Sequence, residues 1–429
     1  MIFTKQRDVL IYFEHVAREL DSCLKLKYDL ERIGLSAEVL PIHRNRYINT
    51  LRYRPKVIVM PFLFADENDR TWEYFKACYG ENVICINLHH EQFYNETTKN
   101  HFMPKNQASM DAYHISWTEG FKKDLIEFGV ASSHIKVTGN PRTDNFYLKP
   151  NPKIEKLKRK YTKLIFIPTS FSWAFVDEAY FLKNAKLDPV KFYQQKEITL
   201  KTIPVFFGMV RKMAKKYPDY CFVLRPHPFE DIQLYNYTLC SIGEQTIESN
   251  IFVNRESNVY DWLNLSDLVI GWFTTVSMEA TLFNVKNLVY QPIEIPDFMQ
   301  MKFIPLYDTI YSEVEQLDSI LENINSFNAS DSRLKEYIRD SFGVADGKVN
   351  ERIAEWISQL ASGVRLASSS RAGRKILIKA GTVDIPKNIM IKTGLINKYN
   401  PIFSGIKEDL LSQRQISKKY REFKNRIPL

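Results

Sequence analysis

The chain has 429 residues, of which 45% are apolar and 13% aromatic, enough to fill the cores of two or three domains. This composition excludes a disordered chain, and no apolar run approaches the roughly eighteen residues of a membrane-spanning helix. The N-terminus lacks an apolar h-region, so we expect no signal peptide. The five cysteines have no metal-ligand spacing and fall mostly within predicted helices or strands. This favours reduced thiols in a cytosolic protein.

The formal charge of +9 is concentrated at the C-terminal end of the chain. Residues 362–429 hold fifteen Lys/Arg against four Asp/Glu, a net charge of +11, whereas the preceding 361 residues hold 44 against 46, a net charge of −2. A solvated, partly disordered tail is one explanation. Attachment to an anionic membrane face is another, because each basic residue near such a surface contributes about 1 kcal/mol. Nucleic acid is not expected as a partner, since no binding motif accompanies the charge.

The N-terminal half alternates strand and helix patterns. Val9–Phe13 predicts a strand, apolar residues from Leu20 to Leu30 predict a helix that Gly34 ends, and a second strand follows near Ala37–Pro41. Further strands are predicted at 56–60, 82–87, 113–117 and 135–138, with a helix over 119–128. The charged stretch 149–163 then separates this half from the next. We therefore expect a first domain over residues 1–150.

The second half repeats the alternation. Strands are predicted at 164–168, 220–225, 251–254, 267–271 and 287–291, and helices at 203–217, 259–265 and 276–283. Short apolar strands that are each followed by a helix imply a buried parallel sheet with right-handed crossovers. We expect this second domain to cover residues 151–361, and residues 362–429 to form the basic tail.

Five short motifs occur in a fixed order along the chain: Glu14-His-Val-Ala-Arg-Glu-Leu-Asp21, His89-His-Glu-Gln92, Val137-Thr-Gly-Asn-Pro-Arg-Thr-Asp144, Arg225-Pro-His-Pro228 and Thr274-Thr-Val-Ser-Met-Glu-Ala280. Over roughly residues 8–300 the chain resembles bacterial surface-carbohydrate biosynthesis proteins of the GT-B glycosyltransferase type. The resemblance implies an α/β fold with two Rossmann-like lobes whose parallel sheets face a central cleft. Similar His-Pro and Ser/Thr motifs occur in sialyltransferases, in Kdo transferases of capsule and lipopolysaccharide assembly, and in CDP-glycerol polymerases. All three use cytidine-nucleotide donors.

The last two of these motifs follow predicted strands of the second lobe. Ligands of open α/β sheets bind beyond the carboxyl ends of the strands, where a helix start attracts an anion. His227 can donate to a phosphate oxygen, and the flanking prolines fix its loop. Glu279 is a candidate for the ribose hydroxyls, although a capping carboxylate would look the same. Helix capping is also the alternative for the hydroxyl residues, but three of them exceed what one cap needs. The predicted donor-nucleotide site comprises Arg225, His227, Pro228, Thr274, Thr275, Ser277 and Glu279.

The catalytic residues are less clearly marked. Transfer of a sugar needs either a base for the acceptor hydroxyl or a nucleophilic carboxylate near the anomeric carbon. Glu91, beside His89 and His90, is the candidate acid or base of the first lobe, and Asp177 is the candidate carboxylate of the second. Arg142 forms part of a turn and is a possible phosphate ligand at the hinge. No third ligand is spaced to complete a metal site with the two histidines, and no cofactor is expected.

These observations predict a metal-independent GT-B glycosyltransferase on the inner face of the cytoplasmic membrane. Its expected donor is a cytidine-activated sugar, such as a CMP-linked Kdo or nonulosonate, and its expected acceptor is a surface polysaccharide or a lipid-linked glycan. Two alternatives stay open. One is a polyol-phosphate transferase that uses CDP-glycerol or a similar donor, and the other is a catalytically silent relative that binds nucleotide or glycan.

Overall fold

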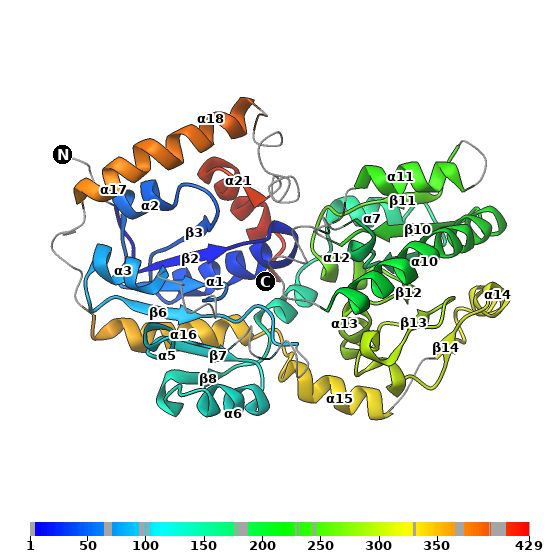
Figure 1. Cartoon of the computed structure of the whole chain (residues 1–429), viewed down its shortest axis with the longest axis horizontal. Coiled ribbons are helices and arrows are strands. Elements are labelled where there is room, and N and C mark those ends of the chain that lie inside the picture. Colours follow the sequence, from blue (N-terminus) through cyan, green and yellow to red (C-terminus); the bar gives the residue numbers. More distant parts are fainter. Residues whose placement is uncertain are drawn as a thin grey trace. The chain divides into compact units, whose positions relative to one another are not determined.

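The computed structural model (Figure 1) describes residues 5–63, 71–93, 99, 103–175, 178, 188–227, 230, 232–242, 246–328, 332–364, 373–393, 395 and 409–428. The chain divides into two compact units. Unit 1 consists of Met1–Lys149 and Asp340–Leu429, and unit 2 consists of Pro150–Arg339. Unit 1 is therefore built from both ends of the chain, whereas unit 2 is continuous.

Unit 1 contains a six-stranded parallel sheet in the order β3-β2-β5-β6-β7-β8. Its strands are β2 Val9–Phe13, β3 Ala37–Pro41, β5 Val57–Met60, β6 Ile84–Asn87, β7 Tyr113–Ser116 and β8 Ile135–Val137; a two-stranded sheet joins β1 Lys5–Gln6 to β4 Tyr53–Arg54. Its helices are η1 Val16–Leu20, α1 Asp21–Arg32, α2 Arg46–Arg52, α3 Thr71–Tyr79, α5 Gln107–Met110, α6 Glu119–Glu127, η2 Ser132–His134, η3 Pro141–Tyr147, α16 Val349–Ser362, α17 Gly373–Lys379, η6 Ala380–Asp384, α18 Ile385–Thr393 and α21 Gln413–Lys424.

Helices cover both faces of this sheet. Alternate residues of β2 point to opposite sides, and because both sets are apolar, both sides need to be covered. Ile11 and its odd-numbered neighbours pack with α1, α16 and α21 in one core. Leu10 and Tyr12 pack on the other side with α3 and with Ile376 of α17. The unbroken apolar strands are those expected of a parallel sheet buried on both faces.

Unit 2 contains a second six-stranded parallel sheet, in the order β11-β10-β9-β12-β13-β14. Its strands are β9 Lys163–Pro168, β10 Tyr220–Arg225, β11 Ile251–Val253, β12 Leu268–Gly271, β13 Asn287–Tyr290 and β14 Ile310–Tyr311. Its helices are α7 Pro152–Lys158, α8 Ser172–Phe175, α10 Pro189–Lys216, α11 Ile232–Ser241, α12 Val259–Leu263, α13 Val276–Leu282, η4 Asp297–Met299, η5 Ile304–Leu306 and α14 Val314–Glu322; α15 Ser332–Phe342 crosses into unit 1. Helices α10, α11 and α14 share one core with the sheet.

The C-terminal part of the chain belongs to unit 1, which differs from the division expected from the sequence. We expected residues up to 361 to complete the second lobe, but Ile353 and Ile357 of α16 are fully buried in the core that contains α1. The described part of residues 362–429 is likewise no purely solvated tail. Ile416 and Phe423 of α21 are buried in that same core, because their amphipathic helix offers an apolar stripe to the sheet.

Candidate functional site

The first candidate cluster lies in unit 2, where the order of its strands reverses. From β9 the chain first adds β10 and β11 on one side and then β12, β13 and β14 on the other, so the switch point lies between β9 and β12. Ligands of such sheets bind beyond the carboxyl ends of the strands at this point. Thr169 follows β9, the His227 loop follows β10 and the Thr274 turn follows β12. Polar side chains therefore follow three neighbouring strands at the edge of the sheet where a ligand is expected.

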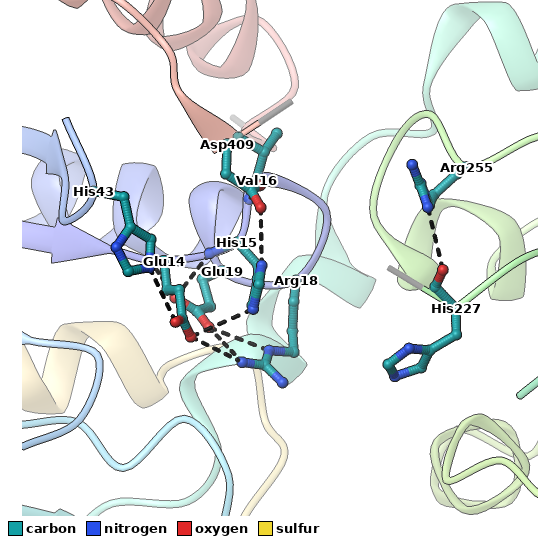
Figure 2. Close-up of polar contacts among 9 residues, drawn as sticks. All are labelled: Glu14, His15, Val16, Arg18, Glu19, His43, His227, Arg255 and Asp409. Atoms are coloured by element: carbon teal, nitrogen blue, oxygen red, sulfur yellow. Dashed lines mark hydrogen bonds and ion pairs between the residues drawn. The ribbon is translucent and has the colours of Figure 1, made fainter. Parts of the chain in front are cut away.

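The His227 loop is fixed through its backbone. The N–H of His227 donates to Glu230 Oε2 at 2.9 Å, and its carbonyl accepts from Arg255 Nη1 at 3.2 Å. Figure 2 shows the imidazole extending away from the Arg255 contact. The Glu230 carboxylate also accepts from the Tyr235 hydroxyl and from Ser172 Oγ. Burial raises the pKa of Glu230 despite these donors. The loop is thus held by side chains other than that of His227.

Arg225 and the Ser/Thr turn are mostly engaged within unit 2. Arg225 is 8% exposed and its Nη1 donates to the carbonyl of Glu256 at 3.4 Å. Thr274 Oγ1 accepts from the N–H of Val276 at 3.2 Å, which is a local turn contact, and the N-cap residue of α13, Thr275, makes no side-chain capping bond. Thr275 is exposed, whereas the Ser277 side chain is buried.

Glu279 is less accessible than its predicted ribose-binding role requires. It is 4% exposed, and its Oε1 accepts from the Tyr260 hydroxyl at 3.0 Å. The contact joins α13 to α12. Its role toward a ribose remains a prediction.

The second candidate cluster lies in unit 1, at the switch point of that sheet between β2 and β5. Glu14 and His15 directly follow β2. Asp409, from the far end of the chain, accepts from His15 Nδ1 at 2.9 Å through Oδ2 and from the N–H of Val16 at 2.6 Å through Oδ1. His15 Nε2 lies 3.4 Å from Glu14 Oε2, and Glu14 Oε1 accepts from His43 Nε2 at 3.2 Å. These groups form a continuous polar chain (Figure 2).

Glu19 holds the backbone of this chain in place. It is fully buried in the π-helix η1, a rare conformation that recurs at functional sites. Its Oε2 accepts from the N–H groups of Glu14 and His15, and its Oε1 accepts from Arg18 Nη2 at 2.9 Å. Burial alone would raise the pKa of Glu19, but His90, Arg18 and the Glu14 N–H together hold this pKa at about 2. The carboxylate is therefore ionised at neutral pH.

His90 adds an uncharged imidazole to the cluster. It is 0% exposed, and neither ring nitrogen has a hydrogen-bond partner among the residues that the structure describes. Burial lowers the pKa of His90 to about 4, with the charges of Arg142 and Arg18 acting in the same direction and Glu19 opposing them. The Arg142 guanidinium lies 5.6 Å from the centre of the Trp117 ring. Because its charge acts on His90, the predicted phosphate ligand Arg142 lies near this group.

The two predicted catalytic carboxylates have different outcomes. Glu91 Oε1 accepts from the N–H of Phe93 at 3.3 Å. Burial would lower the pKa of Arg18, but Glu19 and then Glu91 raise it, which places Glu91 near the same cluster. Asp177, like the predicted donor residue Pro228, lies outside the described residues.

His89, in contrast, is a core residue. Its Nε2 lies 2.7 Å from Nδ1 of His114, whose Nε2 lies 3.0 Å from the Ser109 carbonyl. Because that carbonyl only accepts, His114 donates from Nε2 and accepts from His89. Burial lowers the pKa of both imidazoles. This neutral pair supports the fold.

Seven members of the unit 1 cluster were not among the predicted site residues: Glu14, His15, Arg18, Glu19, His43, His90 and Asp409. The first four lie in the motif Glu14–Asp21, which carried part of the resemblance, so its dense charge after a strand was a usable signal. Asp409 had none, because 394 residues separate it from His15. Among the described residues, no group of three or more His, Cys, Asp or Glu is arranged to hold a metal ion.

Comparisons with known proteins agree on the fold. The sequence matches no family model and no curated protein. The structure of MnaA from S. aureus with UDP has a TM-score of 0.50 at 14% identity, over 85% of this chain and 99% of that chain. The wall teichoic acid polymerase TagF with CDPG has a TM-score of 0.50 at 14% identity, over 82% and 88%. A UDP-N-acetylglucosamine 2-epimerase has a TM-score of 0.50 at 11% identity, over 86% and 99%. The predicted α/β class with two Rossmann-like units of GT-B type is therefore confirmed.

Proposed function

We propose that the protein is a metal-independent glycosyltransferase that uses a cytidine-activated sugar to build a bacterial surface polysaccharide or a lipid-linked glycan. The donor nucleotide would bind unit 2 at its switch point, and unit 1 would bind the acceptor. One observation carries the proposal. His227 stands at the carboxyl end of β10 in a loop whose N–H and carbonyl are both fixed, so its partly buried imidazole lies near the edge where such sheets bind nucleotides.

Two structures of the same fold support a nucleotide-linked donor, since one contains UDP and the other CDPG. The choice of cytidine rests on the resemblance of the His-Pro and Ser/Thr motifs to those of enzymes with cytidine donors. The fold similarity to TagF also favours the polyol-phosphate alternative. In that reaction the electrophile is phosphorus, so the product contains phosphate from the donor. Incorporation of a phosphate label into the product therefore distinguishes the two reactions.

The donor site is tested by titration calorimetry of CMP and CDP against wild-type protein and His227→Ala. A charge-assisted hydrogen bond contributes about 1.5–3 kcal/mol, so the variant should bind the cytidine nucleotide roughly ten- to a hundredfold more weakly. Tyr237→Ala is a suitable control, because its side chain is 73% exposed on α11. Equal binding by wild type and His227→Ala would contradict the site. Tighter binding of UMP or UDP would contradict the cytidine assignment.

A further inference from the structure

We propose that His15 accepts the proton of the acceptor hydroxyl and that Asp409, from the C-terminal segment, is the positioning residue that orients it. The inference rests on the proposed function and assigns the base within the acceptor unit. The proposed base directly follows β2, and its partner lies 394 positions further along the chain.

The geometry of the pair fixes the roles of the two imidazole nitrogens. An ionised carboxylate only accepts, so His15 donates its Nδ1 proton to Asp409 Oδ2 at 2.9 Å. Nε2 is then the nitrogen that can take up a proton. His15 is 5% and Asp409 is 6% exposed, and the second oxygen of Asp409 is tied to the Val16 N–H. A buried partner that is itself held in place fixes both the tautomer and the ring orientation.

Further charged groups lie beside the His15–Asp409 pair. Glu14 faces Nε2 with Oε2 at 3.4 Å, and its other oxygen is held by His43. Glu19 accepts from the His15 N–H, and Arg18 lies against both glutamates. Once formed, the imidazolium would lie between the carboxylates of Asp409 and Glu14, each of which can accept from one of its N–H groups.

The proposed step is balanced as follows. The acceptor O–H bond breaks and its proton moves to His15 Nε2. The acceptor oxygen forms a bond to the electrophilic centre of the donor, while the bond from that centre to the nucleotide phosphate breaks and the nucleotide leaves with the electron pair. The polyol-phosphate alternative needs the same deprotonation, so the inference does not depend on which electrophile reacts.

The test compares Asp409→Asn and His15→Gln with wild type in donor transfer across pH. Asn keeps an oxygen for the Val16 N–H but removes the acceptor for Nδ1–H. We expect each variant to lose at least about a hundredfold in kcat with cytidine-nucleotide binding unchanged. The acidic limb of the Asp409→Asn profile should move to lower pH, because the imidazolium has lost a negative neighbour. The double variant should be no slower than His15→Gln.

Asp384→Asn is the matched control. Asp384 is also a buried carboxylate of the C-terminal segment, and its Oδ2 accepts from the Ile48 N–H at 2.8 Å. This contact is made with the backbone of α2 and not with Glu14, His15 or Val16, so the variant should keep the wild-type acidic limb. An unshifted limb in Asp409→Asn, or loss of the limb in Glu91→Gln instead, would overturn the inference.

A second readout needs no turnover. In a titration of ¹³C-labelled histidine by NMR, the His15 ring of Asp409→Asn should change tautomer and protonate at lower pH than in wild type. An unchanged His15 signal would refute the pairing. Absence of transfer by the wild-type protein with every cytidine donor would instead refute the proposed function, and the NMR comparison would still decide whether the pair exists.

Discussion

At the scale of single residues, the structure shows why position 139, directly before Asn140, is a glycine. Its φ is +94°, and a Cβ at this position would lie 2.2 Å from the Val344 carbonyl oxygen. The N–H of Asn140 donates to the carbonyl of Phe342 at 3.2 Å. The sequence predicted only a turn here. In the structure, the turn also lies against the segment where the chain re-enters unit 1.

We expect Gly139→Ala to destabilise unit 1 by more than the roughly 1–3 kcal/mol of a left-handed alanine, because the backbone of Val344 must also move. Gly34→Ala is the control. Gly34 has a φ of +84°, but a Cβ added there would meet no atom within 4 Å, so this variant should show the conformational cost alone. Urea denaturation of both variants measures the difference. Equal losses in the two variants would show that the close approach to Val344 is unimportant.

Glu19 provides a prediction on pH. Its pKa is about 2 in the folded protein, below the usual 4.5, so its ionised form stabilises the fold above about pH 4.5 and this contribution is lost as the pH falls toward 2. The largest part of this lowering comes from His90, which is uncharged at pH 7, so only the parts from Arg18 and the Glu14 N–H act at that pH. Glu19→Gln should therefore lower the free energy of unfolding at pH 7 by less than the roughly 3 kcal/mol to which the whole shift corresponds, and by less again at pH 3.

Denaturant titrations at the two pH values test this expectation. Glu127→Gln is the control, because its side chain is 67% exposed and its ion pair with Lys99 should contribute little. If Glu19→Gln lowers the free energy of unfolding equally at pH 3 and pH 7, the charge of the carboxylate does not contribute to stability.

At the scale of elements, the sequence predicted the strands better than the helices. A short, continuously apolar strand such as Val9–Phe13 can be recognised from its own residues alone, so β2 lies where it was predicted. Helix α10 was expected from residue 203, yet it begins at Pro189 and continues through Pro204. Proline in a helix interior removes a hydrogen bond and normally ends the helix, which is why the sequence pattern started too late. Packing of Phe192, Thr199 and Phe206 in the interior overrides this preference.

Some parts of the candidate site could likewise be predicted from the sequence, and others could not. Elements next to one another in sequence, such as β10 with His227 and β12 with Thr274, could be placed at one sheet edge from the alternation of strands and helices. The contacts that fix them were not predictable. Asp409 reaches His15, and α16 reaches α1, only after the chain has completed unit 2. Contacts at such separations leave no periodic signal in a single sequence.

At the scale of the whole molecule, the excess positive charge lies in a segment that is partly folded onto unit 1. Ile376 and Ile416 are buried in its two cores, and Asp409 reaches the candidate site. Removal of residues 362–429 would therefore damage unit 1 as well as any membrane contact. No described helix combines the length and apolar character needed to cross a bilayer. A test of membrane attachment must change the outer surface of the segment and keep its buried residues.

Helices α17 and α18, with η6 between them, offer that surface. Large apolar side chains are exposed along them, beside Lys375, Lys379 and Lys392: Leu377 at 48%, Ile378 at 58%, Val383 at 45%, Ile385 at 52% and Ile389 at 56%. Apolar residues interleaved with lysines are typical of segments that lie in the interface of an anionic membrane. We therefore propose that α17 and α18 hold the protein against the membrane where its acceptor is made.

Replacing Ile378, Ile385 and Ile389 together by serine should abolish flotation with phosphatidylglycerol vesicles, because it removes apolar area that would enter the interface. The wild-type protein should be partly released by high salt, since charge attraction is screened within about 8 Å at physiological ionic strength and over shorter distances above it. Nucleotide binding and thermal unfolding should stay at wild-type values, because the three side chains are exposed. Val190→Ser in unit 2, at 73% exposure, is the matched control and should float like wild type. If the triple variant also floats like wild type, α17 and α18 do not form the membrane-binding surface, and the basic segment serves the fold of unit 1 alone.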